Sequence, residues 1–451
     1  MCGIFAVTDN KNASKLAYVG LFTLQHRGQE SAGMVSDSGG RLLYYSAMGL
    51  VNEVFSNEVL ANLKGRSVIG HIRYSTTGSS NLKNAQPLFF NSCLGQLAVA
   101  HNGNITNAGR LRAELQKAGA IFQSTTDSEI IIHLMAKYRG RNLEETIAKN
   151  LRRLEGSYSF LFMAPGKVIG ARDPNGFRPL VLGGMDGSHI LSSETCAIDV
   201  VGGKTVREIE PGELVIIEKG KARFKRFAGA GSFTRCIFET VYFARPDAEI
   251  AGRTVQTARY EIGAMLAREM KDVKADIVSG VPDSGTAYAL GFSKESWIAY
   301  QAVFMRNHYT GRSFMQPDQA LREFTARLKL APIKDLIRGK SIILIDDSLV
   351  RGTTSRKIIG SLKKAGAKKI HMAIASPAVI SPCYYGIDTP TKEELIANNL
   401  SIDKIRRFIG ADGLYYLSLE SLVKACGNGG DRNFCTACFT GKYPTKITSQ
   451  D

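Results

Sequence analysis

The sequence predicts two domains of different class, an α+β first half and an α/β second half built on a parallel sheet. At roughly 150 residues per domain, a chain of 451 residues has room for two or three domains. The first half shows short alternating runs with separate helical stretches, whereas the second alternates apolar runs with helices. Apolar residues make up 44% and charged residues 22% of the chain, a globular composition.

Up to about Phe227, short alternating runs are separated by Gly and Asn turns, which is typical of strands in antiparallel sheets. The expected strands are residues 67–74, 96–100, 158–163 and 213–218. Helical spacing predicts helices at residues 14–25, 107–117 and 127–138. Antiparallel sheets with segregated helices indicate an α+β domain.

After about Thr254, buried strands alternate with helices, which predicts a parallel sheet. The expected helices are residues 255–271, 286–293 and 355–365, and the expected strands are residues 276–281, 341–345 and 369–375. We therefore divide the chain into domains at residues 2–230 and 231–451.

The chain has 58 Lys and Arg against 41 Asp and Glu, a net charge of +17 that favours anionic partners. Its densest basic runs, Lys363-Lys364 and Lys368-Lys369, are short and scattered, which favours phosphate-rich small molecules over nucleic acid. No apolar stretch has membrane-spanning length and no signal segment opens the chain, so we expect a cytoplasmic protein without membrane contact. Eight cysteines are too few for a disulfide scaffold.

The chain opens with Met1-Cys2-Gly3, so that removal of Met1 would make Cys2 the N-terminal residue. A free α-amine titrates at about 7.7 to 8.0 and can act as the base for its own thiol. Four polar segments follow along the chain: His26-Arg27-Gly28-Gln29-Glu30-Ser31, His71-Ile72-Arg73-Tyr74-Ser75-Thr76-Thr77-Gly78, His101-Asn102-Gly103-Asn104-Ile105 and Thr126-Asp127-Ser128-Glu129. In their order and spacing, these segments resemble the glutaminase domain of the N-terminal-nucleophile amidotransferases.

That resemblance implies an αββα fold and a glutamine site around Cys2. Arg73 would hold the α-carboxylate of glutamine, Asp127 would hold its α-ammonium, and Arg27 would help order the site. Asn102 and Gly103 would form the oxyanion hole. Taken alone, an Asn-Gly pair also fits a type I′ hairpin turn.

In the second half, an apolar strand ends in Asp346-Asp347 and is followed by Ser348 to Thr354 and a helix. Ligands of parallel sheets lie beyond the carboxyl ends of the strands, and amides at a helix N-terminus bind phosphate. The acidic pair would hold ribose hydroxyls or Mg²⁺. This stretch resembles the phosphoribosyl pyrophosphate (PRPP) signature of type I phosphoribosyltransferases. The resemblance implies PRPP binding by Asp283, Ser284, Asp346, Asp347, Ser348, Arg351, Gly352, Thr353 and Thr354, and Mg²⁺ binding by Ser284, Asp346 and Asp347.

Residues 312–323, with Arg312-Ser313-Phe314, Gln316-Pro317 and Arg322-Glu323, resemble the mobile hood of the same enzymes. A glutaminase joined to a PRPP domain resembles the glutamine PRPP amidotransferases, which implies formation of 5-phosphoribosylamine, pyrophosphate and glutamate, the first committed step of purine synthesis. It also implies an ammonia passage closed by residues 306–329, inhibition by purine nucleotides and a homotetramer. The alternatives are an amidotransferase with another acceptor and a PRPP-sensing regulator. This chain has Ala331-Pro332 where the family usually has Asn, so it lacks the contribution of that side chain.

Cys435 and Cys438 have the spacing of a metal site or a redox pair. Cys236 precedes the core of the second domain, and Cys383 follows its last expected strand. These four positions resemble the cluster-bearing branch of the family, which implies a [4Fe-4S] cluster, with a structural Zn²⁺ as the alternative. We expect the other cysteines, Cys93, Cys196 and Cys426, to be small buried residues.

Overall fold

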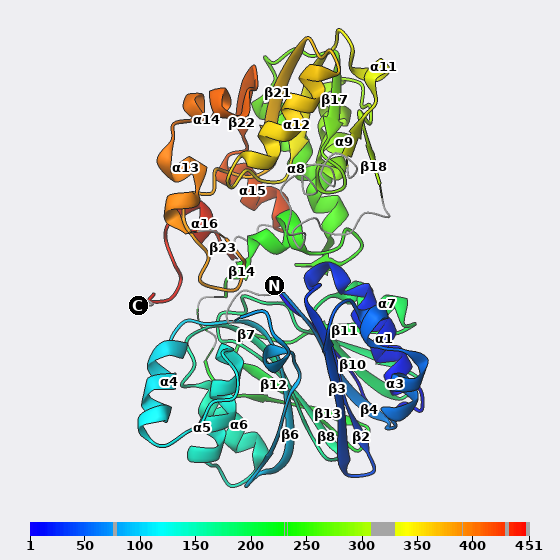
Figure 1. Cartoon of the computed structure of the whole chain (residues 1–451), viewed down its shortest axis with the longest axis vertical. Helices are drawn as coiled ribbons and strands as arrows, with labels where there is room; N and C mark the ends of the chain where they lie inside the picture. Colours follow the sequence, from blue (N-terminus) through cyan, green and yellow to red (C-terminus); the bar gives the residue numbers. More distant parts are fainter. Residues whose placement is uncertain are drawn as a thin grey trace.

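The structure is a computed structural model that describes residues 1–74, 79–229, 231, 233–307, 330–389, 391–428 and 433–447. Its two halves are stacked along the long axis of the molecule, and the N-terminus lies where they meet (Figure 1).

Two antiparallel sheets form the first half. The first has the order β11 (Lys204–Glu208), β9 (Val181–Met185), β10 (Ser188–Ser192), β1 (Gly3–Val7), β4 (Ser67–Arg73), β2 (Ser31–Ser38) and β3 (Arg41–Met48). The second has the order β13 (Lys221–Arg226), β12 (Glu213–Glu218), β8 (Lys167–Arg172), β7 (Gly156–Ala164), β6 (Gly95–Ile105) and β5 (Leu88–Ser92). Strand β1 pairs with β10 and β4, so the N-terminal residues enter the middle of a sheet.

The two sheets pack face to face and helices cover both outer faces. Ile4, Ile69, Leu161 and Val215 belong to the core between the sheets. The outer face of the first sheet is covered by α1 (Ala13–Thr23), α2 (Val51–Val54), α3 (Asn57–Asn62) and α7 (Thr195–Val200). The outer face of the second is covered by α4 (Ala108–Lys117), α5 (Ile130–Lys137) and α6 (Leu143–Leu151). The expected αββα arrangement is confirmed.

A parallel sheet forms the centre of the second half, in the order β17 (Ile277–Gly280), β20 (Ser341–Asp346), β21 (Lys369–Ile374) and β22 (Gly413–Tyr416). Both faces are buried, because Ile343 and Ile345 belong to one core and Ile342 and Leu344 to another. This explains why residues 341–345 are apolar without alternation.

Helices lie on both faces of this sheet. One face carries α8 (Val255–Glu269), α9 (Ser284–Ser296) and α15 (Leu419–Cys426), and the other carries α12 (Thr353–Lys364), α13 (Ile396–Asn399) and α14 (Ile402–Ile409). Three short strand pairs complete the sheets of the described residues: β14 (Arg235–Cys236) with β23 (Phe434–Cys435), β15 (Glu249–Ile250) with β16 (Arg253–Thr254), and β18 (Phe304–Arg306) with β19 (Leu330–Pro332). The second half also contains the π-helical turn Glu239–Phe243 and the short helices α11 (Lys334–Ile337) and α16 (Ala437–Thr440). Helices on both faces of a parallel sheet confirm the α/β class.

The structure corrects two expectations about the strands. Strand β6 runs to Ile105, five residues beyond the expected end, so Asn102 and Gly103 lie inside a strand and not in a hairpin turn. Strand β22 extends the parallel sheet after Cys383, so that cysteine does not follow the last strand. Its short sequence, Gly-Leu-Tyr-Tyr, lacks the long apolar run of the other strands.

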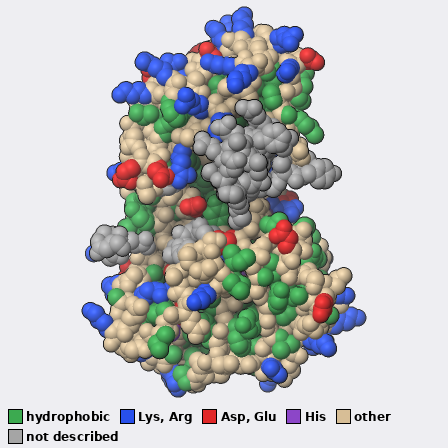
Figure 2. Space-filling model, viewed as in Figure 1, with side chains coloured by type: hydrophobic (Ala, Val, Ile, Leu, Met, Phe, Trp, Pro, Cys, Tyr) green, Lys and Arg blue, Asp and Glu red, His purple; other side chains and the backbone are tan. Residues whose placement is uncertain are grey.

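Lys and Arg side chains gather over the outer end of the second half (Figure 2). The exposed Lys363 and Lys364 end helix α12, and the exposed Lys369 begins β21. None of the helices traced through the described ranges has the length and apolar character needed to cross a bilayer.

Candidate functional site

Cys2 lies at the start of the central strand β1 and is buried. Its thiol lies 3.7 Å from the carbonyl oxygen of Tyr74. Burial raises the pKa of the Cys2 thiol, so the resting group is a neutral thiol that needs a base. The chain-terminal amine beside it, on Met1, is also buried, and burial together with the charges of Arg178 and Arg27 lowers its pKa to about 5. The Met1 amine is therefore uncharged near pH 7.

Asn102 and Gly103, the expected donor pair, are adjacent on β6. Asn102 is wholly buried, and neither its amide nitrogen nor its oxygen has a hydrogen-bond partner. A Cβ on Gly103 would lie 2.1 Å from the carbonyl oxygen of Ser157, so only glycine fits there. Because an unpaired buried amide costs free energy, Asn102 is a group held ready for a ligand.

Arg73 and Asp127 lie around the same thiol, since both alter the pKa of Cys2. The Arg73 guanidinium donates to Glu30 Oε1 at 2.8 Å and to the carbonyl oxygen of Ser79 at 3.0 Å. Asp127 accepts from the amide of Ile105 at 2.9 Å, in a 3₁₀ turn before α5. One cation and one carboxylate beside a thiol match the two charged ends of a free amino acid.

Arg27 is placed differently. It is wholly buried, and its Nε donates to the carbonyl oxygen of Cys2 at 3.0 Å. Its two other nitrogens pair with Glu194 and Glu239. The guanidinium is thus already engaged, which supports the predicted ordering role and not direct contact with substrate.

The second half touches this site through the segment after Cys383. The side-chain amide of Asn104 donates to the carbonyl oxygen of Tyr384 at 2.9 Å, and a Cβ on Gly386 would lie 3.1 Å from the carbonyl carbon and oxygen of Gly103. The strand that carries the donor pair is therefore packed directly against the second half.

A second polar cluster lies at the carboxyl ends of β17 and β20. Gly280 pairs with Ile345, so the loops that follow both strands begin side by side. Ser284, the first residue of α9, lies beside Asp346 and Asp347 and interacts with both carboxyl groups. Ser348 Oγ donates to Asp347 Oδ2 at 2.5 Å. The three predicted Mg²⁺ ligands are thus brought together.

Burial raises the pKa of both carboxyl groups, and the proximity of Asp347 raises that of Asp346 further. Two carboxyl groups that resist ionisation side by side favour a cation or a hydroxyl donor between them.

Helix α12 begins beside the acidic pair. Gly352 caps it with φ +73°, and a Cβ there would lie 3.0 Å from Ile396 Cδ1. Thr353 and Thr354 are exposed at the first turn, whose amides suit phosphate. Two predicted ligands are paired within the protein, Arg351 with Glu394 at 2.6 Å and Asp283 with Arg306. PRPP would have to compete for these two side chains.

Four cysteines from three separate segments gather between the halves. Cys236 and Cys435 are opposite each other on the parallel pair β14 and β23. Burial, and then the thiols of Cys236, Cys383 and Cys435, raise the pKa of Cys438. Within the described ranges, no three Cys, His, Asp or Glu side chains are close enough to hold one metal ion. Among the described residues, the structure thus brings the four cysteines of the predicted ligand set near one another without placing three of them around one metal ion.

The three other cysteines differ in burial. Cys196 and Cys426 are buried, as expected. The expectation for Cys93 is wrong, because this residue is exposed in the turn between β5 and β6.

Some expected residues lie outside the described ranges, namely Ser75 to Gly78 and the hood residues Arg312, Ser313, Phe314, Gln316, Pro317, Arg322 and Glu323. Conversely, Glu194, Glu239 and Arg178, which surround Arg27 and Met1, were not predicted. One signal pointed to Glu239, which is a single acidic residue inside the apolar run Ile237-Phe238-Glu239-Thr240-Val241.

Residues 71–200 match a family model described as a glutamine amidotransferase domain. The chain is 46% identical to the amidophosphoribosyltransferase of Bacillus subtilis over 450 residues, 99% of this chain and 94% of that protein. It is also 46% identical to the amidophosphoribosyltransferase of Archaeoglobus fulgidus, over 100% of this chain and 99% of that protein. A solved structure of glutamine PRPP amidotransferase from B. subtilis, complexed with ADP and GMP, has a TM-score of 0.93 at 45% identity, covering 99% of this chain and 98% of that one.

Proposed function

This chain belongs to the amidophosphoribosyltransferase family, and on that premise we propose how its two halves divide the reaction. The enzyme is a glutamine-dependent pentosyltransferase that performs the first step of purine biosynthesis. The observation that carries the division is the presence of two separate polar clusters, one around Cys2 and one around Asp346 and Asp347. We assign glutamine hydrolysis to the first and the chemistry of PRPP to the second, with the domain boundary at residue 230.

In the first half, the thiol of Cys2 attacks the amide carbon of glutamine. Its proton passes to the α-amine of Cys2, which is free once Met1 is removed. Asn102 and the amide of Gly103 stabilise the oxyanion, and Arg73 and Asp127 hold the charged ends of the substrate. The carbon–nitrogen bond breaks, the amine returns the proton to the leaving ammonia, and water hydrolyses the thioester to glutamate.

In the second half, ammonia attacks C1 of PRPP and the bond from C1 to the pyrophosphate oxygen breaks. The amides and hydroxyls of Thr353 and Thr354 would hold the 5-phosphate, and the loop with Asp283 and Ser284 would hold the pyrophosphate. Mg²⁺, when bound, supplies positive charge to the leaving pyrophosphate. Asp346, Asp347 and Ser284 would hold it, since Mg²⁺ takes one or two carboxylates together with substrate phosphates. The product, after loss of a proton, is 5-phosphoribosylamine.

Three further properties belong to the proposal. The relative solved with ADP and GMP supports regulation by purine nucleotides, and the family resemblance supports a homotetramer. Ammonia must travel between the sites unprotonated, so we propose an enclosed passage between them. Most of the segment expected to close it, residues 308–329, lies outside the described ranges. Cytoplasmic localisation remains a prediction.

The division of labour is tested by supplying glutamine, PRPP and Mg²⁺ to protein purified without oxygen and measuring glutamate and pyrophosphate together. We expect equal yields, because each ammonia released in the first half is consumed in the second. Glutamate without pyrophosphate would contradict the assignment of the second site, and pyrophosphate without glutamate would contradict that of the first.

We propose that Cys236, Cys383, Cys435 and Cys438 hold a [4Fe-4S] cluster. Protein purified without oxygen should contain about four iron and four sulfide per chain. Cys438→Ser should lose most of the iron because one of four ligands is removed, and Cys93→Ser, which changes an exposed cysteine, should keep it. Metal analysis decides the question, and one zinc per chain without sulfide would establish the alternative.

Asn102→Ala should lower kcat for glutamine hydrolysis by about 10² to 10³-fold, the usual effect of losing one oxyanion donor. Its effect on stability should be small, because the amide that is removed has no hydrogen-bond partner in the folded protein. Steady-state kinetics and thermal unfolding measure the two effects. A large fall in melting temperature with full activity would show that Asn102 is structural.

A further inference from the structure

Glu239 lies in the second half, yet its carboxylate binds a guanidinium of the first. Arg27 donates from Nη2 to Glu239 Oε1 at 2.9 Å and from Nη1 to Oε2 at 3.0 Å. Neither side chain is more than 3% exposed. We infer that Glu239 is a positioning residue for glutamine hydrolysis, which fixes Arg27 and through it the backbone of the nucleophile Cys2.

The hydrogen bonds of Arg27 leave it one orientation. Besides the bidentate pair with Glu239, Nη1 binds Glu194, and Nε donates to the carbonyl oxygen of Cys2 at 3.0 Å. A guanidinium is planar, so fixing two of its nitrogens on one carboxylate also fixes the direction of its Nε–H. The carbonyl of Cys2, and hence the start of β1, is held in the plane that Glu239 defines.

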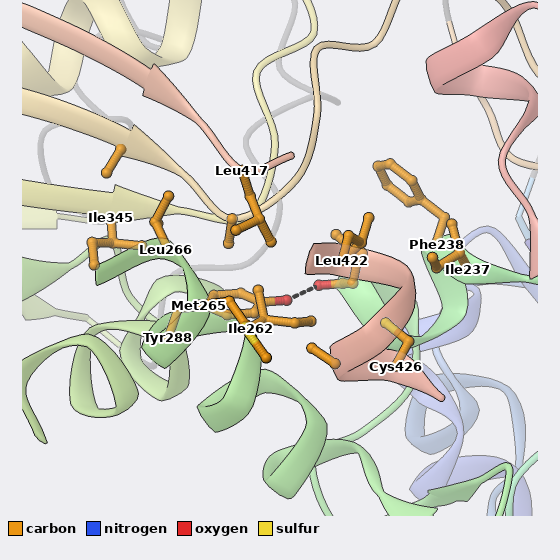
Figure 3. Packing of buried hydrophobic residues seen from close by; sticks show 14 of the residues in the cluster. Ile237, Phe238, Ile262, Met265, Leu266, Tyr288, Ile345, Leu417, Leu422 and Cys426 are labelled. Carbon is orange, nitrogen blue, oxygen red and sulfur yellow. Dashed lines mark hydrogen bonds between the residues drawn. The ribbon is translucent and has the colours of Figure 1, made fainter. Parts of the chain in front are cut away.

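Glu239 is itself anchored by the core of the second half. Ile237, Phe238 and Val241, which flank it, belong to that core. Figure 3 shows Ile237 and Phe238 beside the core residues Leu422 and Cys426 of α15. The hydroxyl of Tyr288 donates to the carbonyl oxygen of Val241 at 2.5 Å. Tyr288 lies on α9, one turn after Ser284. The carboxylate that orients the nucleophile is thus attached to the helix that begins at the proposed pyrophosphate loop.

Stability alone does not explain this arrangement. Glu239 also accepts from Arg178 at 3.2 Å, so one buried carboxylate serves two buried guanidiniums. The desolvation of such groups offsets much of their attraction, and apolar side chains of similar volume stabilise a core as well or better. What the ion group provides that apolar packing cannot is a fixed direction for a hydrogen bond to Cys2.

The inference rests on the proposed function, in which Cys2 is the nucleophile. In Glu239→Gln, kcat for glutamine hydrolysis should fall by about 10²-fold, the scale of a small misplacement of a reacting group. The KM for glutamine should stay within about twofold, because Arg73 and Asp127 are unchanged. Ammonia-dependent release of pyrophosphate should continue. Glu239→Asp keeps the charge but shortens the side chain by one methylene group, so it should show a smaller fall in kcat.

Glu208→Gln is the matched control. Glu208 pairs with the buried Arg172 and with Arg235, and not with Arg27, so both reactions should be retained. The inference is overturned if Glu239→Gln hydrolyses glutamine at the wild-type rate, if Glu208→Gln loses the same activity, or if both Glu239 variants lose the two reactions equally, including by failure to fold. The two proposals fail in different ways. Unequal yields of glutamate and pyrophosphate from the wild-type protein would contradict the division of labour, and a comparison of glutamine hydrolysis between the variants tests the role of Glu239.

Discussion

Cys2→Ala is expected to abolish glutamine hydrolysis, with a fall in kcat of at least about 10⁴-fold, while ammonia-dependent release of pyrophosphate continues. The substitution removes the only atom proposed to bond to the amide carbon, and the other polar groups around it cannot replace a nucleophile. Asp346 and Asp347 belong to the other cluster, on a different sheet. Glutamate and pyrophosphate are measured separately, once with glutamine and once with an ammonium salt as the nitrogen source.

Alanine is small enough for Met1 still to be removed, so the variant differs from the wild type at the thiol and not in the processing of its N-terminus. Cys93→Ala provides the matched control, because Cys93 is exposed in the turn between β5 and β6 and has no proposed role in either site. It should keep both reactions. Loss of both reactions in Cys2→Ala would contradict separate sites, and retained glutamine hydrolysis would exclude Cys2 as the nucleophile.

The sequence predicts the strands best where a local pattern decides their ends. Residues 213–218 were expected as a strand and form β12 with the same limits. The end of β6 was placed too early, because the His101-Asn102-Gly103-Asn104 stretch is polar and reads as a turn. Its pairing with β7 continues through Gly103 opposite Tyr158 to Ile105 opposite Gly156. Tertiary pairing, which no short window of sequence contains, decides that boundary.

The residues of the candidate site also differ in whether the sequence or only the fold identifies them. Ser284, Asp346 and Asp347 were predicted together from the family resemblance. The fold brings them together because each follows a strand of the same parallel sheet, whose strands end at one edge. Glu239 was missed because its partner, Arg27, is 212 residues away. A charge within an apolar run indicates a buried partner without naming it, and only the fold supplies the partner.

Asp347→Ala is expected to lower release of pyrophosphate by about 10³-fold or more with either glutamine or ammonia, since several kcal/mol of charge stabilisation depends on the acidic pair. Hydrolysis of glutamine should persist, because Cys2 and its neighbours are untouched. Pyrophosphate and glutamate are measured with each nitrogen donor in turn. Turnover with free ammonia would remove Asp347 from the substrate site. Asp335→Ala changes an exposed carboxylate on α11 and should have no effect.

Asp347→Asn tests separately how Asp347 affects pyrophosphate release and how it affects the stability of the folded protein. Burial raises the pKa of Asp347 in the folded chain, so the folded state holds this proton more tightly than the unfolded state does. Stability must then fall as the pH rises from the unfolded pKa, about 3.9, through the higher folded pKa. The Asn variant cannot ionise and should lose less stability over that range, giving a higher melting temperature than the wild type near pH 7 without Mg²⁺, although it cannot release pyrophosphate. Thermal unfolding between pH 4 and pH 8 measures the difference, and a variant less stable than the wild type at every pH would show that the acidic pair supports the fold and not the substrate.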